Sequence, residues 1–115
     1  MQYLLLIYTN ETAMLNAPKE AASQTVSAYQ AYTETMKKAG VWVGSNRLRP
    51  TSDATTVRSP AGKQSVLNGP FAETREQLAG YYLIEVPDLD GALAWAKRCP
   101  GAAHGSIEVR PVWGQ

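Results

Sequence analysis

Apolar and polar residues follow two different periods along the chain, and these periods predict its helices and strands. Residues 2–8 form a continuous apolar run, QYLLLIY, which is typical of a strand buried on both faces. Residues 9–17 are polar and irregular, so they predict a loop. From Pro18 onward, apolar residues recur at steps of three and four, which predicts an amphipathic helix ending at Gly40 with one buried face: Ala22, Val26, Tyr29, Tyr32, Met36 and Ala39.

The middle of the chain predicts strands separated by turns. A second strand begins at Val41 and ends near Leu48, before Pro50. Residues 53–58 and 63–67 predict a hairpin, because Ser-Pro-Ala-Gly at 59–62 has good turn chemistry. Residues 68–78 predict a loop or a short helical turn, and residues 81–86, YYLIEV, predict a further strand.

The last part of the chain predicts one helix and one strand. Asp88 is a suitable cap for a helix whose predicted buried face is Leu89, Ala92, Leu93, Ala96 and Cys99. A final strand runs from Ser106 to Trp113, with Glu108 and Arg110 on one face. The order predicts a single α+β domain over residues 1–115, a ferredoxin-like βαββαβ sandwich with an extra hairpin.

The apolar strands also predict a homodimer. Two helices cover only one face of a four-stranded sheet, but residues 4–7 and 83–84 are apolar on both sides. An uncovered apolar face would be a large exposed patch, so we expect a second copy to pack against it. A partly polar cleft between sheet and loops would then be a site for a small molecule.

Composition and motifs narrow the functional classes. The 115 residues carry eleven Lys and Arg against ten Asp and Glu, and this balance argues against a nucleic-acid binder. No apolar stretch approaches the ~18 residues of a membrane helix. Cys99 is the single cysteine, which excludes an intrachain disulfide and favours a cytoplasmic protein. No motif for a metal, nucleotide or dinucleotide is present, so we expect no cofactor.

Charged residues near the end of the chain are candidates for ligand binding. Glu108 and Arg110 share a sheet face, where they could bind a polar ligand or form an ion pair at a subunit interface with Glu73 or Arg75. Arg75 itself could bind a ligand or belong to a solvated loop. Arg49 is a second candidate anion contact, with a surface position as the alternative.

The segment Asn68-Gly69-Pro70-Phe71 has two interpretations. It could shape the rim of a pocket through Asn68, or it could be a turn that uses Phe71 as an apolar anchor.

Proton transfer has three weak candidates, His104, Glu73 and Glu108. The pKa of a histidine lies near neutrality, but His104 sits in a loop without an evident carboxylate to orient it. Cys99 lies on a predicted buried helix face, so we interpret it as a core residue.

Residues 68–86, NGPFAETREQLAGYYLIEV, resemble the DGPF-motif branch of the YCII-related proteins. The opening MQYLLLIY, Leu48-Arg49-Pro50 and residues 94–112 support this resemblance, which covers nearly the whole chain. It implies a ferredoxin-like fold of the dimeric α/β-barrel type and says little about activity. Genes of this family often lie beside those of alternative sigma factors, which implies a regulatory setting.

Two positions depart from the family. Asn68 replaces the aspartate of the motif, and an amide cannot act as a general base or carry charge. The wider group is thought to use a His–Asp pair whose histidine lies in the N-terminal half, whereas the single histidine here is His104. The pair therefore cannot be transferred to this chain.

The sequence favours a small-molecule-binding homodimer with a regulatory role. A lyase or isomerase that works by proton transfer is the second hypothesis, and a protein-interaction module linked to sigma-factor regulation is the third.

Overall fold

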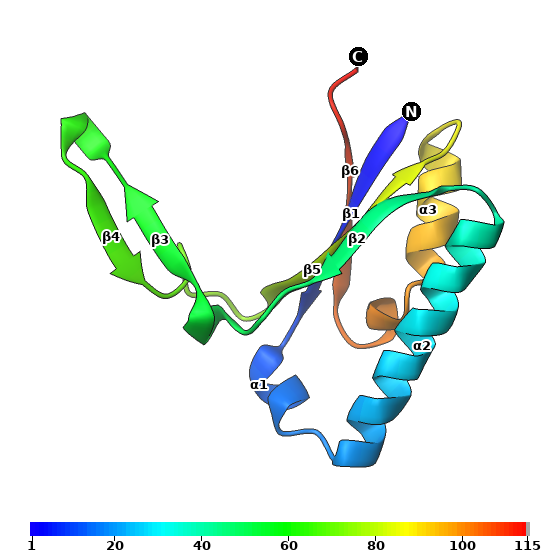
Figure 1. Cartoon of the computed structure of the whole chain (residues 1–115), viewed down its shortest axis with the longest axis horizontal. Helices are drawn as coiled ribbons and strands as arrows, with labels where there is room; N and C mark the ends of the chain where they lie inside the picture. The colour runs from blue at the N-terminus through cyan, green and yellow to red at the C-terminus, as the bar shows by residue number, and fades with distance from the viewer. Residues whose placement is uncertain (115) are drawn as a thin grey trace.

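A computed structural model describes residues 1–114, in which four strands form one antiparallel sheet in the order β2–β5–β1–β6 (Figure 1). Two longer helices cover one face of this main sheet. This α+β arrangement is compatible with the predicted ferredoxin-like fold. The elements are β1 (Gln2–Thr9), α2 (Lys19–Lys38), β2 (Trp42–Arg47), β5 (Gln77–Glu85), α3 (Leu89–Arg98) and β6 (Ser106–Pro111).

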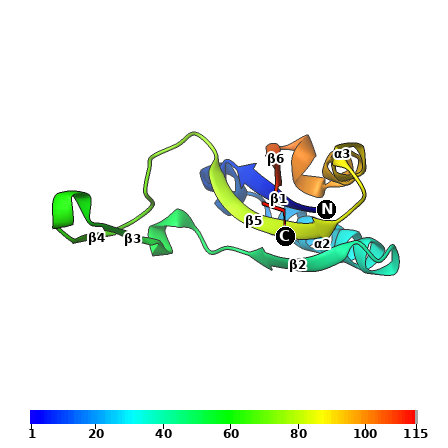
Figure 2. The ribbon, with the colours of Figure 1, turned by 90° about the horizontal axis from the view of Figure 1, so that it is seen from above.

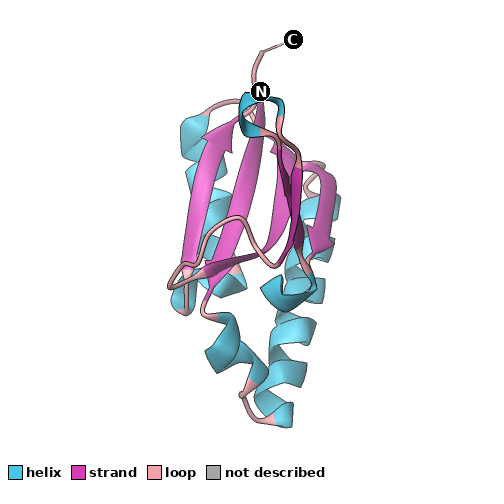
Figure 3. Ribbon diagram, turned by 90° about the vertical axis from the view of Figure 1, so that its left-hand side faces the viewer, coloured by secondary structure: helices cyan, strands magenta, loops and turns pink. Residues whose placement is uncertain are grey.

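Alternation along β1 separates the two faces of the main sheet. Tyr3, Leu5 and Ile7 are buried against the helices, whereas Leu4 and Leu6 are half-buried on the other side. Tyr81 and Leu83 of β5 pair with Leu6 and Leu4, so these four side chains share that side. We call it the open face, because α2 and α3 lie behind the strands in Figure 3. The run predicted to be buried on both faces is therefore buried on one face within a single chain.

The core lies between the sheet and the two longer helices. Leu5, Met36 and Ile84 are its largest fully buried side chains. Tyr32 of α2 packs edge-on against Tyr82, with ring centroids 5.2 Å apart, and its hydroxyl donates a 2.6 Å hydrogen bond to the carbonyl of Trp95. This bond joins α2 to α3 and satisfies a polar group that burial would otherwise leave unpaired.

The buried face predicted for the first long helix is correct for only part of its length. Tyr32 and Met36 are buried, but Ala22, Val26 and Ala39 are exposed. The N-terminal half of α2 extends beyond the end of the sheet (Figure 1), which leaves Ala22 and Val26 exposed. Leu89 of α3 was also predicted to be buried, but it is exposed because it lies in the first turn.

A short helix, α1 (Glu11–Leu15), occupies part of the segment that predicted a loop. The side chain of Asn10 caps it by accepting a hydrogen bond from the amide of Ala13 at 3.0 Å. Five residues are too few to give an apolar period, so only the cap could have indicated this helix.

The predicted hairpin forms and stands apart from the main sheet. Its strands, β3 (Thr55–Arg58) and β4 (Ser65–Asn68), pair only with each other. Short 3₁₀ turns precede and connect them at Thr51–Asp53 and Pro60–Gly62, and a third 3₁₀ turn, η3, follows α3 at Pro100–Ala103. We call residues 54–71 the arm, which projects away from the body of the protein in Figures 1 and 2.

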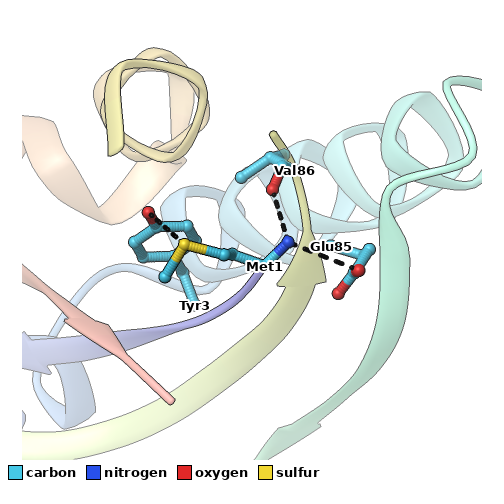
Figure 4. Close-up of polar contacts among 4 residues, drawn as sticks. All are labelled: Met1, Tyr3, Glu85 and Val86. Atoms are coloured by element: carbon cyan, nitrogen blue, oxygen red, sulfur yellow. Dashed lines mark hydrogen bonds and ion pairs between the residues drawn. The ribbon is translucent and has the colours of Figure 1, made fainter. Parts of the chain in front are cut away.

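Met1 connects the beginning of β1 to the end of β5 (Figure 4). Its amino group donates to the carbonyl of Val86 at 3.0 Å and to Oε1 of Glu85 at 3.4 Å. The hydroxyl of Tyr3 lies 3.8 Å from the sulfur of Met1. Among residues 1–114, none of the helices is both long enough and apolar enough to span a membrane.

Candidate functional site

Two neighbouring clefts lie where β2 ends and β5 begins. The first cleft, of about 290 Å³, lies beside α2 and is lined by residues that include Tyr29, Ser45 and Tyr82. The second cleft, of about 240 Å³, lies beside α1 and is lined mainly by apolar side chains, among them Met14, Leu15, Leu48 and Pro50. Arg47 and Ala79 line both clefts.

A β-bulge in β5 places Ala79 between the two clefts. Ile7 pairs with Gly80 and Tyr8 pairs with Leu78, which leaves Ala79 without a partner on β1. The carbonyl of Ala79 instead accepts a 2.8 Å hydrogen bond from the amide of Leu48, just beyond β2. Bulges are common beside binding sites because they redirect the backbone, and this one turns β5 toward both clefts.

Gly80 permits β2 and β5 to approach closely beside the bulge. A Cβ atom at this position would lie 2.8 Å from the carbonyl oxygen of Asn46 and 3.4 Å from the Cα of Arg47. Both neighbouring atoms belong to the backbone, so they could not move aside without displacing β2. The wall of the first cleft therefore depends on glycine at this position.

Two stacked tyrosines line the first cleft, with the centroids of Tyr29 and Tyr82 6.5 Å apart. The hydroxyl of Tyr82 shares a 2.7 Å hydrogen bond with Oγ1 of Thr33, and Sγ of Cys99 lies 3.8 Å from the hydroxyl of Tyr29. Burial raises the pKa of both tyrosines and of the Cys99 thiol above their ordinary values. These groups are therefore neutral near pH 7, and the hydroxyls act as hydrogen-bonding groups rather than as bases.

Arg47 is exposed and lies where the two clefts meet. The three ion pairs found within residues 1–114 do not include it, whereas Arg49 pairs with Asp53 at 2.9 Å. The carboxylate of Glu11 also lines the second cleft, but it accepts hydrogen bonds from the amide and the hydroxyl of Thr51. A free guanidinium with apolar walls nearby suits an anionic group attached to an apolar body.

The predicted pair of Glu108 and Arg110 lies elsewhere, on the open face. Their Cα partners on β1 are Leu6 and Leu4, which confirms that the two side chains share a face. They form an ion pair with each other within one chain. The predicted pair with Glu73 or Arg75 would form at a subunit interface, so it stays a prediction. Within one chain, each of these charges is therefore already partnered.

The other predicted site residues are dispersed over the surface. Asn68 ends β4 in the arm, and Glu73 and Arg75 follow in the loop that returns to β5; all three are exposed. His104 is exposed at the end of η3, and no hydrogen bond within residues 1–114 involves its imidazole. Of the predicted ligand-binding residues, only Arg49 lines a cleft. The roles predicted for these residues stay predictions.

The sequence indicates only part of the lining of the first cleft: as strand aromatics, Tyr81 and Tyr82 could line a pocket or serve as packing, and both line this cleft. Tyr29 was assigned to a buried helix face, Ser45 to an ordinary strand, and Arg47 was not singled out. The signal that could have found Arg47 is its place two residues before Arg49, at the end of a strand. Gly80 was the one sequence signal for the bulge at Ala79, because an isolated glycine in a strand often marks a bulge or a close approach of another backbone.

Metal binding has no structural support in the part of the chain that is described. No group of three or more His, Cys, Asp or Glu side chains within residues 1–114 is placed to hold a metal ion. Hydrogen bonds, apolar contacts and the charge of Arg47 are thus the means by which the two clefts could hold a molecule.

Comparison with known proteins identifies the family. The model of the YCII-related domain matches residues 1–114. An uncharacterised protein, R00369, from Rhizobium meliloti (strain 1021) is 40% identical over 114 residues, which cover 97% of this chain and 92% of that protein. The chain therefore belongs to the YCII-related family.

Proposed function

We propose that this protein is a homodimer that binds a small molecule with an apolar body and one anionic group. The observation that carries the proposal is the unpaired guanidinium of Arg47 at the junction of two clefts. An arginine side chain presents a planar fork of donors that suits a carboxylate or a phosphate. Cleft volumes of about 290 and 240 Å³ lie near the lower end of the range for ligand sites, so they favour a small ligand.

The chemistry of the cleft walls supports binding more than turnover. Tyr29, Tyr82 and the nearby Cys99 all keep their protons at neutral pH because burial raises their pKa values. A protonated, buried thiol is a poor nucleophile, and a neutral tyrosine hydroxyl is a poor base. A ligand sensor without a reaction of its own would suit the regulatory role that the resemblance to the DGPF branch implies.

The open face supports the homodimer of the α/β-barrel type. Leu4, Leu6, Tyr81 and Leu83 form an apolar strip that no element of the same chain covers. A two-fold axis would bring this strip against its own copy, with the sheets ~10 Å apart. A cytoplasmic location belongs to the same proposal, since the thiol of Cys99 is free.

The first experiment is native mass spectrometry of the protein purified from its host. We expect a dimer with an additional small mass on each subunit. A monomer would contradict the proposed assembly, and the absence of bound mass would shift the question to titration with known probes.

Titration then locates the site. Benzoate and phenyl phosphate serve as anionic probes and benzyl alcohol as the neutral control, with the fluorescence of Trp42 as a signal because its indole donates to Ser45 in the first cleft at 3.0 Å. We expect Arg47→Gln to weaken binding of the anionic probes roughly tenfold to a hundredfold, because a charge-assisted hydrogen bond is lost.

Arg110→Gln is the matched control, since it removes the same charge from the open face. Because the open face is also the proposed dimer interface, native mass spectrometry first checks that Arg110→Gln is still a dimer. Its binding of the probes should then be unchanged. Loss of binding in Arg110→Gln together with normal binding in Arg47→Gln would place the ligand on the open face, and so contradict the assignment to the two clefts.

A further inference from the structure

Within residues 1–114, the two strands of the arm pair with no strand of the main sheet. They form a separate sheet, and a two-stranded hairpin is marginally stable in water unless it packs against something else. Four large apolar side chains of the arm are nevertheless mostly exposed, at 57%, 62%, 55% and 76% of their areas: Val57, Val66, Leu67 and Phe71. Such a concentration of exposed apolar groups is typical of an interaction surface.

The exposed side chains occupy both faces of the hairpin. Val57 lies directly opposite Val66 on one face, and Leu67 lies opposite Thr56 on the other. The guanidinium of Arg58 stacks over the ring of Phe71, 5.7 Å from its centroid. Solvent on both faces of the hairpin leaves these apolar side chains exposed, whereas packing against another protein surface would bury them.

The NGPF segment fixes how the arm leaves the body. The amide of Gly69 donates to the carbonyl of Ala54 at 2.6 Å, and the hydroxyl of Thr56 donates to the carbonyl of Gly69 at 2.9 Å. Gly69 has a φ of 108°, a conformation that other residues rarely adopt. These bonds close the base of the arm and present Phe71 to solvent directly after the turn.

The arm projects from the side of the main sheet that carries the open face. In Figures 1 and 2 the helices lie on one side of the main sheet and the arm extends on the other. Figure 3 looks onto the open face from the direction of the arm. A molecule packed on the open face would therefore have the arm along its flank.

Packing of the open face would bury only part of each of its four apolar side chains. Its four apolar side chains are already half-buried by their neighbours, so packing would hide only the remainder. A stable interface commonly buries ~800 Å² on each partner. The side chains of the arm are more exposed, and they supply the additional apolar area on the same side of the molecule.

We propose that the arm of each copy clasps the second copy of the chain, across the same two-fold axis that joins the open faces. Val57, Val66 and Phe71 would pack against the body of the partner, and the symmetry would make this contact twice. The inference rests on the proposed homodimer and adds to it the surface that holds the two copies together. It gives the NGPF segment a role in assembly instead of in ligand contact.

Sedimentation velocity over a range of concentrations measures the dissociation constant of the dimer for Val66→Glu and Phe71→Ala. We expect each variant to weaken the dimer at least about tenfold, as loss of a buried apolar anchor does. Gln64→Glu is the control, because it adds the same negative charge two residues away at the polar end of the hairpin. It should keep the dissociation constant of the unmodified protein.

Hydrogen exchange separates failure of this inference from failure of the homodimer. At dimer concentrations, we expect amides of β3 and β4 to be protected, and to lose protection when Leu6→Glu disrupts the open face. A dimer whose arm exchanges freely and whose arm variants associate normally would overturn the clasp and leave the homodimer intact. A protein that stays monomeric at every concentration would overturn both.

Discussion

The buried tyrosines carry much of the chemistry of this core. Three of them lie near Cys99: Tyr29, Tyr32 and Tyr82. Burial is the largest cause of the raised pKa of each. A tyrosinate in such a position would lose its hydration, and at Tyr32 the charge of Arg98 offsets only part of that cost.

Alkaline pH should therefore destabilise the protein. The unfolded chain releases tyrosine protons above its ordinary pKa of 10.0, whereas the folded chain retains them. The free energy of unfolding should begin to fall above pH 9, where the unfolded chain releases the proton of Cys99, and should fall more steeply above pH 10. Urea unfolding at several pH values from 8 to 11 measures this, and a free energy that does not change would contradict the burial of these hydroxyls.

Met36 is the clearest single position for measuring the strength of the core. It is fully buried between α2 and the sheet, so Met36→Ala should cost about 2–5 kcal/mol of unfolding free energy. Val26→Ala on the same helix is the control, because Val26 is exposed where α2 extends beyond the sheet. Urea denaturation should place Val26→Ala within about 0.5 kcal/mol of the unmodified protein. Equal losses would mean that the N-terminal half of α2 is also packed.

At the scale of elements, periodicity predicted most helices and strands but not their irregularities. The spacing of apolar residues predicts α2 and the last strand, and the turn residues predict the hairpin. The cap at Asp88 marks the start of α3. Pairing with β1 and β2 extends β5 back to Gln77, four residues before its predicted start, and this pairing is a long-range property that a local pattern does not contain. The bulge at Ala79, which forms part of both clefts, was not predicted.

The close approach of β2 and β5 at Gly80 can be tested by substitution. Gly80→Ala should cost about 1–3 kcal/mol, because the new methyl group would meet the backbone of Asn46 at 2.8 Å. Gly44→Ala on β2 is the control, since a Cβ there would meet no atom within 4 Å. Thermal unfolding should show Gly44→Ala to be at least as stable as the unmodified protein, because alanine restricts the unfolded chain. If both variants lost the same stability, the close approach would not be responsible.

At the scale of the whole molecule, the chemistry of the turn predicted that the arm exists but not where it points. Its direction depends on the backbone at Pro50 and Gly69 and on how the main sheet twists, none of which a local pattern specifies. A local pattern also does not predict the separation of Arg47 from Arg110. This separation depends on the strand order, which puts β2 and β6 on opposite edges of the sheet.

Mass action should link the stability of the molecule to its concentration if it is a homodimer. Only the folded chain presents the open face and the arm, so association stabilises the folded state. The midpoint of thermal unfolding should rise when the protein concentration is raised tenfold, as differential scanning calorimetry can measure. The Leu6→Glu variant should show a midpoint that does not depend on concentration. A constant midpoint for the unmodified protein would argue against a dimer in the range tested.

Ala79 has a consequence for selectivity. It lines both clefts, as Arg47 does, and its side chain is only a methyl group. A larger side chain there would act as a partition, and the protein would then discriminate between ligands by their length. One substitution at a bulge could thus change which molecules are accepted, while Arg47 continued to hold the anionic end.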